Sequence, residues 1–214
     1  HKEEGEETVK AIEQMGRKGY AYQLDATDAQ QVKVVVDQVA ETFNGHIDIL
    51  MNNAGHLVAR SPIVDMTDEH WFQTINVNLT STFYCTRAVL PFMNTGWGRI
   101  INMSSLAARN GGGNGATAYA ASKGAIIAFT RGLCKEVAEQ GITVNAVAPG
   151  LILETPFHET FNTDAGIQGA INSTPLKRGG TPDDVANAVL YFATELGSFI
   201  TGEIIEINGG LYFA

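Results

Sequence analysis

The sequence is short of positive charge and of long apolar runs. Its 214 residues include 14 Lys and Arg against 23 Asp and Glu, which gives a formal net charge of −9. Because no basic stripe stands out, the composition argues against a nucleic-acid partner. No apolar run approaches the roughly 18 residues that a membrane span needs, so we expect no membrane association.

Cysteine is scarce as well, and no metal-binding pattern is present. Cys85 and Cys134 lie in apolar, helix-like surroundings, which is typical of buried free thiols in a reducing compartment. Together with the lack of a secretory signal, this predicts a cytoplasmic protein. No cluster of His, Cys and Asp has metal-ligand spacing, so we expect no metal site. The hydrophobic fraction of 44% suffices for one domain over residues 1–214.

The most informative pair in the chain is Tyr119 and Lys123. Residues at i and i+4 share one face of a helix, and a lysine charge beside a tyrosine lowers the phenol pKa. Such a tyrosine could exchange a proton with a carbonyl or an alcohol. A solvated surface pair is the commoner outcome of this spacing, so the neighbouring motifs must decide.

Short strand patterns alternate with helical patterns along the chain, which predicts an α/β fold with a parallel sheet covered on both faces. We expect residues 151–180 to be irregular, because Gly, Pro and small polar residues fill them. Expected helices are an opening one that ends near Gly16, one capped by Thr27 or Asp28, one over about 68–94, one around Tyr119, and one capped by Thr181. Expected strands are 20–24, 47–51, 99–103, 142–147 and 203–207.

The conspicuous residues gather where these strands end. They are Asp25, the run Asn52 to Gly55, Ser104 with Ser105, and Pro149 with Gly150. In parallel sheets, ligands bind beyond the carboxyl ends of the strands, so these positions predict a binding site.

With these motifs the chain resembles the short-chain dehydrogenase/reductase family, in its short single-domain branch. The resemblance covers essentially the whole chain. It rests on Asn52-Asn53-Ala54-Gly55, Asn78, Ser105, Tyr119-x-x-x-Lys123, Pro149-Gly150, Ile200-Thr201-Gly202 and Asn208-Gly209-Gly210. It implies a Rossmann-like, doubly wound sheet and hydride transfer between NAD or NADP and a carbonyl/alcohol pair.

The resemblance also implies roles for four catalytic residues. Tyr119 would be the general acid in reduction and the general base in oxidation. Lys123 would lower the pKa of Tyr119 and bind the nicotinamide ribose, and Ser105 would hydrogen-bond the substrate oxygen. Asn78 would hold a water that links Lys123 to solvent. Asn76 lies nearby, but the spacing of seven residues from Trp71 matches the family at Asn78.

Further positions would contact the cofactor by the same resemblance. Asp25 would contact the adenine, the backbone of Asn53, Ala54 and Gly55 would line its ribose, Pro149 and Gly150 would pass beside the nicotinamide, and Thr155 would bond the carboxamide. Asp25 has an alternative role as the cap of the next turn. Asn52 is expected to tie strands together, and Ser104 to be an ordinary strand-end serine.

The chain departs from the family pattern in three places. The spacing from Ser105 to Tyr119 is 14 residues, where 13 is commoner, and Thr155 lies one residue late. The Gly-rich phosphate loop Thr-Gly-x-x-x-Gly-x-Gly does not occur in the sequence. Two strands and a helix, roughly 35–50 residues, would precede residue 1 in the family, so we expect these 214 residues not to be the working protein. Strand 20–24 would then lack a neighbour.

The leading hypothesis is an NAD(P)-dependent oxidoreductase acting on a small polar sugar or uronate, with residues 154–174 as a lid. Glu154, His158 and Asn162 favour that substrate, and a 3-oxoacyl thioester is the alternative. His158 is more typical of a surface or substrate-pocket residue than of a catalyst, and His56 is expected either to face the cleft or to lie on the surface. A catalytically silent nucleotide-binding protein and a sugar-nucleotide epimerase or dehydratase stay open as other classes. The resemblance further implies a homotetramer.

Overall fold

A four-stranded parallel sheet organises the chain. The computed structural model describes residues 2–93, 96–161 and 163–214, without the side chains of 2 and 157–159. The strands are β1 (Ile49–Asn52), β2 (Gly98–Met103), β3 (Ile142–Pro149) and β4 (Ile204–Ile207), hydrogen-bonded in that order. Their pairing brings Asn52 beside Asn102 and Met103 beside Val147, so the carboxyl ends of the strands lie at one edge.

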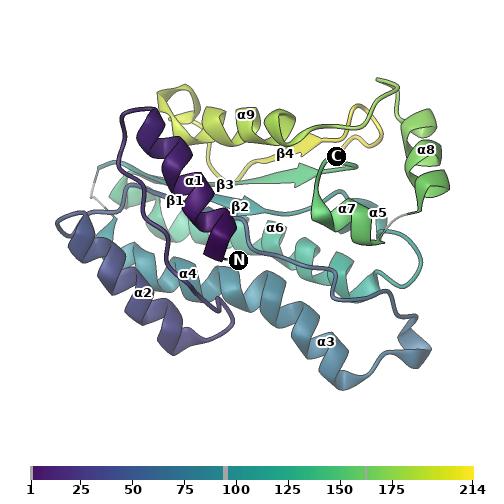
Figure 1. Cartoon of the computed structure of the whole chain (residues 1–214), viewed down its shortest axis with the longest axis horizontal. Helices are drawn as coiled ribbons and strands as arrows, with labels where there is room; N and C mark the ends of the chain where they lie inside the picture. Colours follow the sequence, from purple (N-terminus) through teal and green to yellow (C-terminus); the bar gives the residue numbers. More distant parts are fainter. Residues whose placement is uncertain (1, 94–95, 162) are drawn as a thin grey trace.

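Helices cover both faces of the sheet (Figure 1). On one face lie α2 (Ala29–Thr42), α4 (Ser81–Val89) and α6 (Thr117–Val137), and on the other lies α9 (Pro182–Ala193). Alternation along each strand explains the two layers, because successive side chains point to opposite faces. Ile100 packs on the α6 side and Ile101 packs beside Phe192 of α9, and all three side chains are fully buried.

Side-chain caps fix where two of these helices begin. Asp28 accepts hydrogen bonds from the backbone of Gln30 and Gln31 at the start of α2, so Asp28 rather than Thr27 is the cap. Thr181 and Asp184 form a reciprocal capping box at the start of α9, with Pro182 in the first turn. The caps satisfy backbone N–H groups that have no partner within the helix.

Two expectations about secondary structure are wrong. Residues 20–24 form no strand, because a strand exists only by pairing and no strand lies beside them in the described residues. Residues 151–180 are not wholly irregular, since they contain α7 (Pro156–Phe161) and α8 (Asp164–Ser173). The Thr163 side chain caps α8 by accepting from the Gly166 N–H, a signal that the Gly-rich composition obscured.

The remaining helices match the sequence pattern more closely. The opening helix is α1 (Lys2–Gln14), and a short α5 (Ala107–Asn110) follows β2. The region expected as one helix over 68–94 is α3 (Asp68–Ile75), a π-helical segment Asn76–Thr80, and α4. A π-helical turn inside a helix is often found at a functional site, and this one carries Asn78. No helix in the described part of the chain is long and apolar enough to cross a membrane.

Candidate active site

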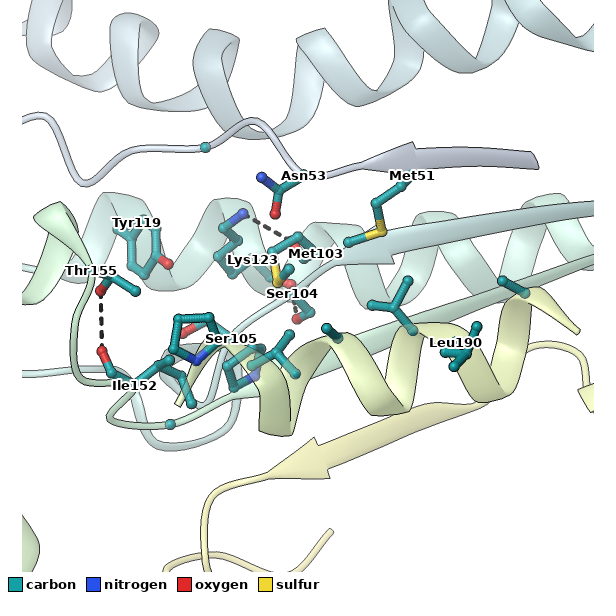
Figure 2. Close-up of a pocket in the computed structure, with 18 residues that line it drawn as sticks. Met51, Asn53, Met103, Ser104, Ser105, Tyr119, Lys123, Ile152, Thr155 and Leu190 are labelled. Atoms are coloured by element: carbon teal, nitrogen blue, oxygen red, sulfur yellow. Dashed lines mark hydrogen bonds between the residues drawn. The ribbon is translucent and has the colours of Figure 1, made fainter. Parts of the chain in front are cut away.

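A cavity of about 730 Å³ lies at the carboxyl ends of the strands and holds most of the expected catalytic residues. Its wall includes Ser105 from the end of β2 and both Tyr119 and Lys123 from α6. Figure 2 shows the Tyr119 and Lys123 side chains leaving the same helix toward the cavity. The spacing of four residues therefore produces a shared face, and that face lines the cavity.

The Ser105 hydroxyl lies where it can stabilise the Tyr119 phenolate by hydrogen bonding. Burial raises the pKa of the Tyr119 phenol, and the hydrogen bond with Ser105 partly offsets this. The prediction that Lys123 lowers the pKa of Tyr119 is therefore wrong for the protein alone, because burial removes hydration and so disfavours the charged phenolate. A phenol with a raised pKa stays protonated near neutral pH, which suits a proton donor in reduction.

Lys123 is one of the most buried side chains of the protein, with 2% of its surface exposed. Burial lowers the pKa of its ammonium group to about 8. The Nζ atom donates to the Met103 carbonyl oxygen over 2.8 Å and lies 5.8 Å from the centre of the Tyr119 ring. The Met103 carbonyl is a partner that the sequence did not reveal, because nothing about a strand-end methionine marks its backbone.

Asn78 is fully buried and lies behind the residues that line the cavity, as part of the same centre. Its Nδ2 atom donates to the carbonyl oxygens of His56 at 2.7 Å and Thr74 at 2.8 Å, and its Oδ1 accepts from the His56 N–H at 3.1 Å. The side chain therefore fastens the loop after β1 to the α3–α4 region.

Gly55 lies close to both the Asn78 and the Lys123 side chains. A Cβ atom on Gly55 would lie 2.7 Å from Asn78 Oδ1 and 2.8 Å from Lys123 Nζ, closer than Cβ atoms approach other atoms. The backbone of residue 55 thus fills the space between these two side chains. All four residues expected to be catalytic meet within one centre.

Only some of the residues expected to contact the cofactor line this cavity. Asn53, Gly55, Pro149, Gly150 and Thr155 line the cavity, and Asn53 and Ala54 also line a neighbouring apolar cavity of about 350 Å³ along β1. The Thr155 hydroxyl donates to the Ile152 carbonyl oxygen. Its bond to a carboxamide stays a prediction.

Asp25 lines neither cavity. Its Oδ1 atom accepts from the Thr27 N–H at 2.8 Å and from the Thr27 hydroxyl at 2.7 Å. This is the turn-capping alternative, and its contact with adenine stays a prediction.

Two neighbouring polar residues have structural hydrogen bonds, as expected. Asn52 donates to Asn102 Oδ1 at 2.9 Å and so ties β1 to β2. The Ser104 hydroxyl donates to the Lys123 carbonyl oxygen at 2.9 Å, which holds α6 against the end of β2. Within the described residues, no group of three or more His, Cys, Asp or Glu side chains could hold a metal ion.

A family model described as enoyl-(acyl carrier protein) reductase matches residues 1–212. The chain belongs to the short-chain dehydrogenase/reductase family. It is 38% identical over 213 residues to the 3-oxoacyl-(acyl-carrier-protein) reductase FabG of Haemophilus influenzae, covering 99% of this chain and 85% of that protein. It is 41% identical over 211 residues to FabG of Thermotoga maritima, covering 98% and 84%.

A solved structure has the same fold. It is a blue fluorescent protein from a metagenomic library in complex with NADPH, with a TM-score of 0.89, 32% identity, and coverage of 98% of this chain and 82% of that one. This short-chain dehydrogenase/reductase is thus an NAD(P)-dependent oxidoreductase acting on a carbonyl/alcohol pair.

The cavity fits the nicotinamide half of such a cofactor. Gly55 lines the cavity next to the Lys123 ammonium group, and the Tyr119 phenol lines the same cavity. A bound nicotinamide supplies or accepts the hydride. Around it, Lys123 would hold the ribose, Tyr119 would give a proton to the substrate oxygen in reduction and remove it in oxidation, and Ser105 would hydrogen-bond that oxygen.

Proposed function

We propose that this short-chain dehydrogenase/reductase reduces the keto group of a 3-oxoacyl thioester. The proposal rests on the Tyr119–Ser105 hydroxyl pair beside the buried Lys123, because this arrangement can protonate a carbonyl oxygen as hydride arrives at its carbon. The names of the two bacterial relatives favour the thioester over the sugar or uronate that the sequence favoured.

The wall of the cavity supports the same choice. Apolar side chains on α9 and on two strand ends form much of it: Met51, Met103, Val185, Val189 and Leu190. Such a wall suits an acyl chain better than a polyhydroxylated sugar, whose hydroxyls would lose hydrogen bonds on burial. Glu154, one of the three residues that favoured a sugar, does not line the cavity. The His158 side chain and Asn162 lie outside the described residues.

NADPH is the cofactor we propose, with NADH as the alternative. The support is the NADPH complex of the structural relative described above. The homotetramer and the cytoplasmic location stay predictions, and sedimentation velocity on the purified protein tests the first of them.

The deciding experiment compares two classes of substrate and tests the need for the Tyr119 hydroxyl. NADPH and NADH oxidation is followed with acetoacetyl thioesters and with a keto-uronate, for the wild type, Tyr119→Phe and Tyr20→Phe. Tyr20→Phe is the matched control, because its ring packs against Phe43 and neither residue lines the cavity. We expect thioester turnover that falls by about 10²–10⁴ in Tyr119→Phe and is unchanged in Tyr20→Phe.

Three results would count against the proposal. A large preference for the keto-uronate would restore the sugar-type substrate. Equal rates in the wild type and Tyr119→Phe, both above background, would remove Tyr119 from the mechanism. Cofactor binding without turnover on any keto compound would support the catalytically silent alternative.

A further inference from the structure

The loop after β1 has a backbone conformation that needs an explanation. Val58 has φ of +68°, a left-handed conformation that β-branched residues rarely adopt. The His56 ring stabilises it, because its Nδ1 accepts from the Val58 N–H over 2.9 Å. Leu57 between them is 2% exposed, which anchors the turn in the core. Strained turns of this kind persist where the surroundings hold them, and they are common at functional sites.

The same turn connects the catalytic centre with α7. The backbone of His56 is hydrogen-bonded in both directions by the Asn78 side chain, as described above. Its ring packs edge-on against Phe161, with centroids 5.2 Å apart and planes at 70°. Residue 56 therefore touches the Asn78 centre through its backbone and the last residue of α7 through its side chain.

Arg60 adds a second connection to the same place. Its Nε donates to the Phe161 carbonyl oxygen over 3.3 Å, and its Nη1 donates to the Asn114 carbonyl oxygen over 3.2 Å. The adjacent Ser61 N–H donates to the Gly115 carbonyl oxygen at 2.9 Å. One planar guanidinium thus joins the end of α7 to the Gly-rich loop that leads into α6, a task for which its forked donors are suited.

We propose that His56 and Arg60 form a latch, which fixes α7 and the Gly-rich loop against the catalytic centre and so sets the affinity for the keto substrate. Both are positioning residues, since neither lines the cavity. They act through α7, which directly follows the cavity residue Thr155. The role in substrate affinity rests on the proposed function, whereas the latch itself does not.

Substitutions can separate the two halves of the latch. Arg60→Met keeps the aliphatic stem and removes both donors, and Arg60→Lys keeps the charge with a single amine in place of the fork. His56→Asn keeps a side-chain acceptor for the Val58 N–H and removes the ring contact with Phe161. Arg17→Met is the control, because Arg17 is exposed and does not line the cavity.

Steady-state kinetics tests the effect on substrate. We expect Arg60→Met to raise KM for the keto substrate about tenfold, with kcat within about twofold and KM for the nicotinamide cofactor unchanged. Arg60→Lys should recover only part of the loss, and Arg17→Met should match the wild type. A fall in kcat with KM unchanged, or full recovery in Arg60→Lys, would overturn the positioning role.

Hydrogen–deuterium exchange tests the latch without turnover. Amides of residues 157–161 should exchange several-fold faster in Arg60→Met and in His56→Asn than in the wild type. The double variant should exchange little faster than either single one, because both contacts hold the same residue. Unchanged exchange in both single variants would refute the latch. Faster exchange in a protein that reduces no keto compound would support the latch while rejecting the proposed function.

Discussion

Replacing Gly55 with alanine places a methyl group between Asn78 and Lys123. The new Cβ would lie 2.7 Å from Asn78 Oδ1 and 2.8 Å from Lys123 Nζ, where ordinary contacts are 3.4–4 Å. Both contacts are then too short, by about 0.7 Å and about 0.6 Å, so both side chains or the backbone of residue 55 must move. Lys123 is the more mobile of the two, because one hydrogen bond to Met103 holds its amine whereas three hold the Asn78 amide.

The magnitude follows from this displacement. A misplacement of about 1 Å in a catalytic constellation can reduce the rate about 10²-fold, which is about 2.7 kcal/mol in transition-state stabilisation. Overpacking a buried site costs about 1–3 kcal/mol of folding free energy. For a chain of this size, each kcal/mol lowers Tm by about 2–4 °C. We therefore expect Gly55→Ala to be folded, slightly less stable, and roughly 100-fold less active.

Gly132→Ala is the matched control. Gly132 lies in α6, the helix that carries Tyr119 and Lys123, and a Cβ there would meet nothing within 4 Å. Removing a glycine from a helix interior stabilises it by about 1 kcal/mol, so this variant should keep its activity and unfold at a slightly higher temperature.

The assay is kcat/KM for the keto substrate together with thermal unfolding of both variants. A Gly55→Ala protein with wild-type kcat/KM and wild-type Tm would refute the reasoning, because the methyl group would then have found room without moving Lys123 or Asn78. Equal losses of activity in both variants would show that α6 tolerates no change, and the steric argument about Gly55 would fail.

Three further predictions concern ionisation and helix capping. Because Lys123 has a pKa of about 8 when folded against 10.5 ordinarily, its burial costs about 3 kcal/mol below pH 8, and this cost disappears as the pH rises to 10.5. Relative to the wild type, Lys123→Met should therefore lose less unfolding free energy at neutral pH than at pH 10, or even gain some at neutral pH, and it should abolish turnover. Chemical unfolding at both pH values measures this, and the same difference between variant and wild type at both would contradict the burial cost. Because burial raises the pKa of Tyr119, alcohol oxidation should accelerate as the pH rises from 7 to 10, whereas ketone reduction should not, and rate profiles in both directions check this. Thr181→Ala removes the side-chain cap of α9 and should cost about 1 kcal/mol, measured by urea unfolding against Thr160→Ala as an exposed control.

Some features of the fold follow from local sequence alone. The short runs rich in Ile and Val in β2 and β3 identify strands, and the caps Asp28 and Thr181 identify helix starts, because these signals act between residues close in the chain. The failed strand at 20–24 shows the limit of such signals. Its pattern is suitable, but pairing depends on a neighbour that no local pattern supplies.

The lid region shows a second limit. Gly and Pro in residues 151–180 suggested irregular structure, yet Thr163 caps a ten-residue helix. Small residues lower the helix propensity, but the local cap at Thr163 supports the first turn of the helix.

For the active site too, some features follow from the sequence and others only from the tertiary structure. The motifs of the sequence by themselves identified the family and the reaction class through the resemblance that they carry. They also singled out Asn78, Ser105, Tyr119 and Lys123, whose catalytic roles stay predictions. Only the tertiary structure decided how these residues are ionised and held. It buries Lys123 against the Met103 carbonyl, raises the Tyr119 pKa instead of lowering it, and leaves Gly55 no room for a side chain. Desolvation and close contact depend on which atoms surround a group, and those atoms come from segments far apart in the chain.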